Sequence, residues 1–139
     1  CIQSLDRINL WEKIQEEAAR IDKRITCLLQ IKVAMEETKY GWELEELIPI
    51  LASGQQNQYP NVIIGGVMGM ASFTDDTDQV RREMKQIKAS FDLMRQEYFA
   101  DSIAFKTISM GMSGDYQIAL EEGSNMIRVG SLLFPSTDH

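Results

Sequence analysis

Short apolar runs alternate with longer stretches of helical periodicity along this chain. The apolar runs are typical of strands and fall at residues 1–5, 25–33, 62–64, 105–110 and 126–129. The run at 25–33 is too apolar for a strand with one face in water, so it predicts a strand that is buried on both faces. The pattern indicates five strands, each separated from the next by a helical segment.

The helical segments carry apolar residues at spacings of three and four. The first covers residues 8–21, with Asp6 as its expected N-cap, and the second is a short helix over 44–51. The third begins at a capped, acidic segment at 75–78, and a fourth short helix is expected at 116–122. The apolar stripe of the third helix consists of Val80, Met84, Ile87, Phe91, Met94 and Tyr98.

The predicted order of elements is β-α-β-α-β-α-β-α-β. This alternation predicts the α/β class with a parallel sheet, which is either an open doubly wound sheet or a TIM-type barrel. Periodicity does not separate these two architectures. In both of them ligands bind at the carboxyl ends of the strands, so the candidate site residues are sought there.

Composition narrows the chemistry that this chain can perform. Its 139 residues suit a single domain over 1–139, and its one histidine is the terminal His139. A histidine general base and a His-rich metal site are therefore not expected. The two cysteines, Cys1 and Cys27, form no Cys-x-x-Cys pair, which argues against structural zinc and a disulfide framework and suits a reducing cytosol.

The net charge of -7 disfavours binding to a polyphosphate backbone. The basic cluster Arg81, Arg82, Lys85 and Lys88 lies among acidic residues and is interpreted as a solvated helix face. No apolar run approaches the ~20 residues that a membrane span needs. The sequence therefore predicts a cytoplasmic protein that binds neither nucleic acid nor a membrane.

Two strand ends carry residues that suit an anion. In the segment 109–115 a strand ends in a glycine-containing turn, so backbone N–H groups and the Ser113 hydroxyl can converge on one anion. In the segment 128–131, Gly130 allows a ligand to approach the main chain, and Ser131 adds a hydroxyl. Gly-Ser turns also follow strands in proteins without a ligand there, so both interpretations stay open.

Two cations near the predicted strand ends also bear on the site. Arg128 lies within a strand, where an unpaired guanidinium would be costly, so its partner is expected to be either an acidic side chain or a ligand. Lys32 is interpreted as a solvated or salt-bridged amine rather than a reactive one.

These segments resemble the YggS/PROSC family of pyridoxal 5′-phosphate (PLP) homeostasis proteins, whose fold is the alanine racemase N-terminal barrel of PLP fold type III. The resemblance runs along essentially the whole chain. The stretches similar to the family's fourth strand, fifth strand, EE-x-K-x-G loop and G-L-M segment are 2–6, 27–31, 36–41 and 66–70. The most specific matches are 109–115 and 123–131.

The resemblance implies strands four to eight of a (β/α)8 barrel and a PLP site at their ends. In that site Met112, Ser113, Gly130 and Ser131 would hold the phosphate, and Arg128 would face the pyridine nitrogen. Because arginine keeps its proton, the ring nitrogen would stay unprotonated and the cofactor would promote carbanion chemistry only weakly. The implied function is PLP homeostasis by a carrier or regulator without strong turnover, with PLP-dependent apo-enzymes as further partners and no metal.

The chain also departs from the family. Asn125 and Ser131 stand where threonine is usual, Pro135 where glycine is common, and Lys32 where asparagine is common. The Schiff-base lysine of the family ends its first strand, whereas this sequence begins at the fourth, so non-covalent or absent PLP is expected for this chain alone.

The predicted partial barrel has two open sheet edges. They predict self-association or association with a missing N-terminal portion. Two alternative functions remain: a fold-type-III racemase or decarboxylase, and a TIM-barrel enzyme that acts on a sugar phosphate.

Overall fold

The chain folds as alternating strands and helices in the predicted order. The computed structural model describes residues 2–33, 41–72, 74–112 and 116–128. Within these ranges the strands are β1 (Ile2–Leu5), β2 (Ile25–Ile31), β3 (Val62–Gly69), β4 (Thr107–Met112) and β5 (Met126–Arg128). The helices are α1 (Ile8–Arg20), α2 (Leu44–Ala52), α3 (Thr77–Glu97), α4 (Tyr116–Glu121) and the short 3-10 helix η1 (Gln55–Gln58).

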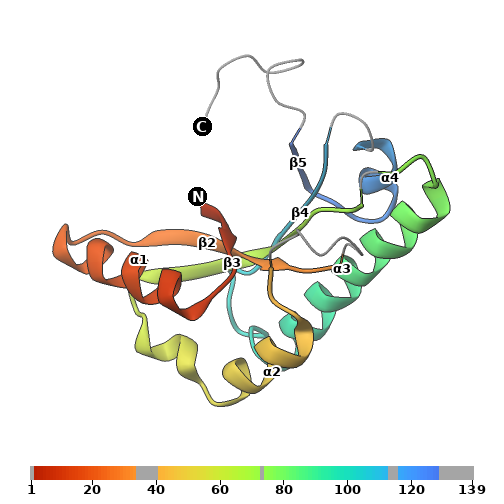
Figure 1. The fold of residues 1–139 in the computed structure, drawn as a ribbon. Helices are drawn as coiled ribbons and strands as arrows, with labels where there is room; N and C mark the ends of the chain where they lie inside the picture. Colours follow the sequence, from red (N-terminus) through yellow and green to blue (C-terminus); the bar gives the residue numbers. More distant parts are fainter. Residues whose placement is uncertain (1, 34–40, 73, 113–115, 129–139) are drawn as a thin grey trace.

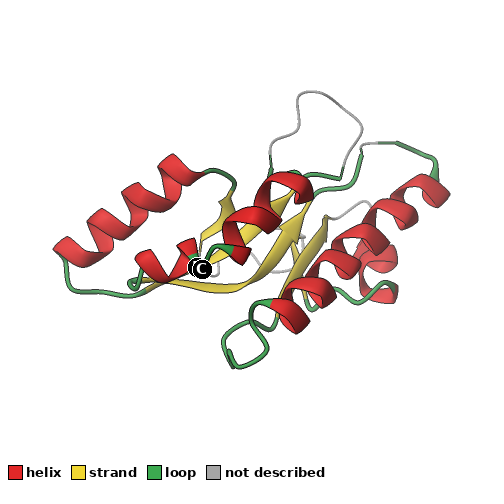
Figure 2. Ribbon diagram, turned by 90° about the horizontal axis from the view of Figure 1, so that it is seen from below, coloured by secondary structure: helices red, strands yellow, loops and turns green. Residues whose placement is uncertain are grey.

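The strands form one parallel sheet whose spatial order, β1-β2-β3-β4-β5, follows the sequence. Helices α1, α2 and α3 lie on the same side of this sheet (Figures 1 and 2). In a doubly wound sheet the strand order would reverse at one point and the helices would cover both faces. Sequential order with helices on one side is instead the arrangement of a segment of a (β/α) barrel.

The main apolar core fills the space between the sheet and these helices. Alternate residues of the strands point into it, and the apolar stripe of α3 packs on them. The indole N–H of Trp42, which precedes α2, donates to the carbonyl of Leu5 at 3.1 Å and so links α2 to the end of β1. Fully buried members of the core include Leu5, Trp11, Leu29, Leu47, Val67, Met84, Ile87, Met94 and Phe105.

Asp6 does not cap α1, which corrects the sequence prediction. The N-cap residue is Arg7, which makes no side-chain capping bond. The Asp6 carboxylate instead pairs with the Arg7 guanidinium, at 2.7 Å between Oδ1 and Nη1. The predicted helix ended at residue 21, but α1 ends at Arg20. Ile21 therefore lies beyond the helix, where its side chain is 48% exposed. The buried stripe of α1 consists of Trp11, Ile14 and Ala18.

Strands β3 and β4 both extend further than predicted. β3 continues past Ile64 to Gly69, and its pairing with β2 skips Gly65, because Cys27 lies opposite Ile64 and Leu28 opposite Gly66. Such a bulge accommodates an extra residue without ending the strand. β4 reaches Met112, where a turn was predicted from residue 111, because pairing with β5 continues to that position.

Candidate functional site

One row of residues crosses the sheet just below the predicted ligand edge. Gln30 of β2 lies opposite Met68 of β3, Met68 opposite Ser109 of β4, and Ser109 opposite Met126 of β5. Gln30, Met68 and Ser109 are buried, but their neighbours in sequence, not they, belong to the core under the helices. This row therefore lies on the face of the sheet that those helices do not cover.

The next row brings two predicted site positions together. Met112 of β4 lies opposite Arg128 of β5, at the carboxyl ends of both strands. Between this pair and the Ser109 to Met126 pair, β4 contains one residue more than β5, so the register shifts. Bulges of this kind are frequent next to active sites, where they redirect a strand end. The other three predicted residues, Ser113, Gly130 and Ser131, lie outside the described residues.

The two residues before β5 tie this strand to β4. The Asn125 side chain accepts from the N–H of Ile108 at 2.8 Å and donates to the carbonyl of Lys106 at 2.8 Å. The buried Ser124 hydroxyl lies 2.8 Å from the carbonyl of Met126 and within hydrogen-bonding distance of the β4 backbone. The sequence placed both residues in the motif 123–131 but did not predict their hydrogen bonds to β4. An asparagine directly before a strand could have indicated such bonds, because its side chain readily bonds to backbone groups.

A buried carboxylate holds the chain just after β3. Glu83 of α3 is 4% exposed and accepts from the backbone N–H of Ser72 at 2.6 Å and from its hydroxyl at 2.7 Å. Gln79, one turn earlier, donates to the same carboxylate at 3.2 Å. The sequence analysis missed this group, because no local pattern shows that Ser72 folds back onto α3.

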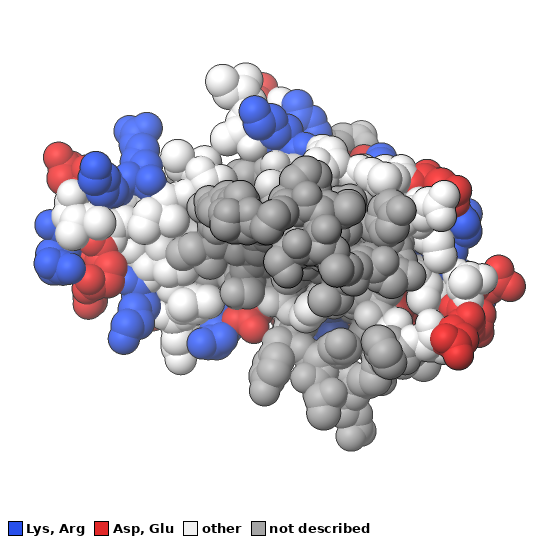
Figure 3. All heavy atoms as spheres, turned by 90° about the horizontal axis from the view of Figure 1, so that it is seen from above, with Lys and Arg blue, Asp and Glu red and all other residues white. Residues whose placement is uncertain are grey.

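The basic cluster of α3 lies on a partly exposed helix face, and two of its residues form ion pairs. Arg81 contacts Glu121 at 2.8 Å and Glu122 at 2.6 Å, which joins α3 to the end of α4, and these hydrogen bonds raise the pKa of Arg81. Lys88 pairs with Asp92 at 2.8 Å. On the face drawn in Figure 3, both basic and acidic side chains lie around the margin. Arg82 and Lys85 are exposed and Arg81 and Lys88 are half-buried, in agreement with the prediction of a solvated face.

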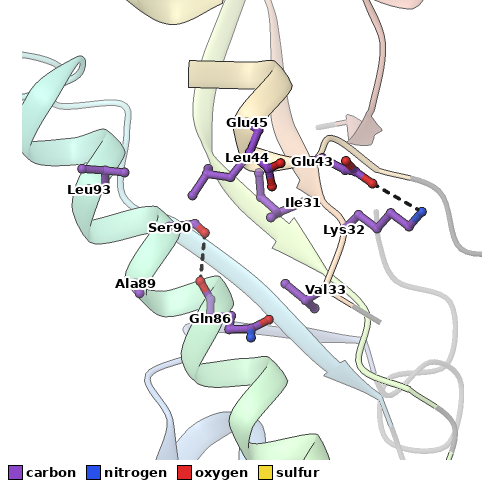
Figure 4. Close-up of a pocket in the computed structure, with 10 residues that line it drawn as sticks. All are labelled: Ile31, Lys32, Val33, Glu43, Leu44, Glu45, Gln86, Ala89, Ser90 and Leu93. Carbon is purple, nitrogen blue, oxygen red and sulfur yellow. Dashed lines mark hydrogen bonds and ion pairs between the residues drawn. The ribbon is translucent and has the colours of Figure 1, made fainter. Parts of the chain in front are cut away.

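A cavity of about 540 Å³ lies on the helix side of the sheet, between the end of β2, the start of α2 and α3 (Figure 4). Lys32 borders it, and its ammonium lies 3.9 Å from the carboxylate of Glu43. Lys32 was predicted to be a solvated or salt-bridged amine, and this ion pair agrees with the salt-bridged alternative. Ser90, on the opposite wall, donates its hydroxyl to the carbonyl of Gln86 at 2.9 Å.

Two other kinds of site are not found in the described part of the chain. Within the ranges that the structure describes, no group of three or more His, Cys, Asp or Glu side chains could hold a metal ion. Among the helices of those ranges, none combines the length and the hydropathy that crossing a bilayer requires.

Comparison with known sequences identifies the family. The chain matches the family described as "Alanine racemase, N-terminal domain" over residues 1–138. A pyridoxal phosphate homeostasis protein of Aquifex aeolicus is 35% identical over 133 residues, which cover 96% of this chain and 56% of that protein. The chain thus spans little more than half the length of this relative.

Solved structures agree with the sequence comparison. PipY of Synechococcus elongatus, solved without PLP, superposes with a TM-score of 0.84 at 28% identity, over 94% of this chain and 59% of PipY. The structure of PipY with PLP bound superposes with a TM-score of 0.79 at 26% identity, over 94% of this chain and 58% of PipY. The parallel sheet thus matches part of the PipY fold. The chain belongs to the alanine racemase N-terminal domain family, and its resemblance to the YggS/PROSC proteins of PLP homeostasis is confirmed.

Proposed function

We propose that this chain carries the phosphate-binding part of a PLP site and serves in PLP homeostasis as a carrier or regulator. The observation that carries the proposal is the pairing of Met112 with Arg128 at adjacent strand ends in a chain whose relatives are PLP homeostasis proteins. A solved relative, PipY, has a structure with PLP bound. When bound, PLP supplies a reactive aldehyde and a pyridine ring that can withdraw electrons.

The phosphate would be held by the loops that follow β4 and β5. Met112 is the last residue of β4 and Ser113 follows it in the sequence, while Gly130 and Ser131 come shortly after β5 in the sequence. Backbone N–H groups, hydroxyls and a glycine that permits close approach form a donor set that fits a phosphate dianion. Support for this fit comes from the parallel register, because β4 and β5 end side by side and their loops begin at the same edge.

Arg128 would face the pyridine nitrogen. A guanidinium only donates hydrogen bonds and keeps its proton, so it would hold this nitrogen in its unprotonated form. A site of this kind binds the cofactor without strongly activating it for carbanion chemistry. This reasoning supports a non-catalytic role, in which the chain binds PLP and passes it to PLP-dependent apo-enzymes.

The five strands would be strands four to eight of a (β/α)8 barrel. The sequential strand order supports this assignment. The Schiff-base lysine would then belong to an N-terminal portion that precedes them in longer relatives. Without that portion β1 and β5 would be the open edges of the barrel, and we propose that this chain self-associates or pairs with such a portion through them.

Titration with PLP tests the proposed function. We expect saturable binding of PLP by the chain, and binding at least about tenfold weaker in the Arg128→Ala and Ser113→Ala variants, because each loses a charge-assisted hydrogen bond. Ser53→Ala and Arg24→Ala, at exposed positions away from the β4 and β5 ends, are the matched controls and should bind like the wild type.

Three outcomes would contradict the proposal. Equal PLP affinity in the wild type and in both site variants would remove the site assignment. Interconversion of alanine enantiomers by the chain, measured by chiral chromatography with added PLP, would favour a fold-type-III enzyme. Saturable binding of a sugar phosphate without binding of PLP would favour a metabolic TIM-barrel enzyme.

A further inference from the structure

A second cavity, of about 600 Å³, lies at the amino end of the sheet. Its lining comes from η1 and the turn after it, from the first residues of β3, and from the end of α3 with the turn that follows. β3 contains eight residues and is about 25 Å long, so this cavity is far from Met112 and Arg128 at the carboxyl ends of β4 and β5. The cavity is therefore separate from the proposed PLP site.

Buried apolar and aromatic side chains form one part of the cavity wall. Ile64 is 6% exposed and Phe99 is 9% exposed. The ring of Phe99 stacks on that of Phe105, with 4.4 Å between the centroids. Tyr59, also in the wall, packs its ring on Trp11 with 5.2 Å between the centroids. Because these rings are held from behind, this part of the wall needs little ordering when a ligand binds.

The other part of the wall is acidic. The described residues that line the cavity include two exposed carboxylates, Glu97 and Asp101, and no Lys, Arg or His. Within the ranges that the structure describes, neither carboxylate belongs to an ion pair. The Arg95 guanidinium donates instead to the backbone carbonyls of Ser102 and Phe105. Two unpaired carboxylates at one cavity attract a cation, and the apolar wall beside them strengthens this attraction.

The side chain of Gln56 leaves a further acceptor unused. Its NH₂ group donates to the carbonyl of Leu51 at 3.3 Å. Its oxygen is one of two buried side-chain polar atoms in the described part of the chain that have no hydrogen-bond partner. A buried carbonyl without a donor is costly. Gln56 lines the cavity, and an N–H group of a ligand is the kind of donor that its oxygen lacks.

We propose that this cavity binds a small organic ammonium ion with an apolar body. The ammonium group pairs with Glu97 and Asp101, and the apolar body contacts Tyr98 and Phe99, whose ring faces also attract a cation. A hard metal ion does not fit, because it needs six or more oxygen ligands and the described residues contain no group of three or more metal-binding side chains. This inference does not depend on the proposed PLP site.

A ligand-observed NMR titration of the 139-residue chain with phenethylammonium tests the proposal. We expect saturable binding with a dissociation constant of about 1 mM or lower. The neutral analogue 2-phenylethanol has the same shape without the charge and should bind about fivefold more weakly. The anion 3-phenylpropionate should not bind, because the carboxylates repel it.

Charge-removing variants locate the ammonium group. The double variant Glu97→Gln/Asp101→Asn should bind phenethylammonium about fivefold more weakly and should bind 2-phenylethanol like the wild type, since only the ammonium pairs with the carboxylates. The double variant Glu16→Gln/Asp75→Asn removes the same two charges at exposed positions outside the cavity, so it should bind both compounds like the wild type. This comparison separates a local pairing from an effect of net charge.

A variant that fills the cavity tests the place of the apolar body. Ala100 is exposed and lines the cavity, so Ala100→Trp should abolish binding of both compounds, whereas Ala19→Trp, at an exposed position of α1, should not. Three results would each overturn the proposal: no saturable binding of phenethylammonium by the wild type, equal affinities for the amine and the alcohol, or equal effects of the two double variants.

Discussion

At the scale of single residues, one buried carboxylate is satisfied by donors from its own helix and from the segment after β3. The Glu83 carboxylate is 4% exposed and accepts from the N–H and the hydroxyl of Ser72 and from Gln79. A buried carboxylate is costly unless donors replace its hydration. The three donors therefore allow α3 to hold the chain just after β3, next to the strands that carry the proposed site.

Cys27 is the residue whose titration should be visible in the stability of the fold. It is fully buried in β2, and desolvation raises the pKa of its thiol from 9.0 to about 11. Above pH 9 the unfolded state loses this proton and the folded state keeps it, so the free energy of unfolding should fall as pH rises toward 11. The contribution lost over this range is about 2 kcal/mol.

Urea unfolding at several pH values between 9 and 11 checks this prediction in the wild type and in Cys27→Ala. The variant lacks the thiol and should show a shallower decline, although a small cavity lowers its stability overall. Parallel pH profiles of the two proteins would contradict the raised pKa. Thiol labelling mapped to Cys27 should likewise proceed only on unfolding, since the thiolate is the reactive form.

At the scale of elements, the approach of β3 to β4 depends on one glycine. Gly66 has φ of +147°. A Cβ atom at this position would overlap the Thr107 backbone, most severely its carbonyl oxygen. Thr107 is also its partner in the sheet. The position therefore excludes other residues for two reasons, the backbone conformation and the distance to the neighbouring strand.

Gly66→Ala is accordingly expected to destabilise the fold by more than about 3 kcal/mol, because the clash is with main chain that cannot move aside. Gly54→Ala is the matched control. It also has positive φ, of +78°, but its added Cβ would meet only the side chain of Asn57 at 3.5 Å. Its cost should be about 1 kcal/mol from the backbone conformation alone. Equal unfolding free energies of the two variants in urea would contradict the steric argument.

At the scale of the whole molecule, the described sheet has two edge strands. In the described part of the chain β1 and β5 each pair with a strand on one side only, and the strand order places them at opposite edges. Unpaired edges attract further strands. The matched region spans 56% of the length of its Aquifex relative, so that relative has further residues that this comparison does not match.

Purified chain is therefore expected to self-associate, with a mass by light scattering above that of the monomer and rising with concentration. Ser4→Lys adds charge to β1 and should reduce this association, because edge lysines oppose strand pairing. Gln58→Lys adds the same charge at an exposed position of η1 and should have no effect. A stable, monodisperse wild-type monomer would contradict the prediction.

The proposed site could be predicted only in part. The motif around Arg128 and the turn after Ser109 pointed to adjacent strand ends, and the register of β4 with β5 brings Met112 opposite Arg128. The positions of Ser113, Gly130 and Ser131 stay predictions. The contacts of Ser124 and Asn125 with β4 were not predicted, because they join residues 14 to 19 positions apart.

The sequence by itself determined the order of the elements and the parallel class of the sheet, because hydrophobic periodicity is a local property of each segment. It did not separate a doubly wound sheet from a barrel segment, and it misplaced the N-cap of α1 and the ends of β3 and β4. Only the tertiary structure decided the strand order, the bulges and the contacts before β5. These depend on hydrogen bonds between segments that are distant in the chain, and periodicity within one segment carries no information about its neighbour's register.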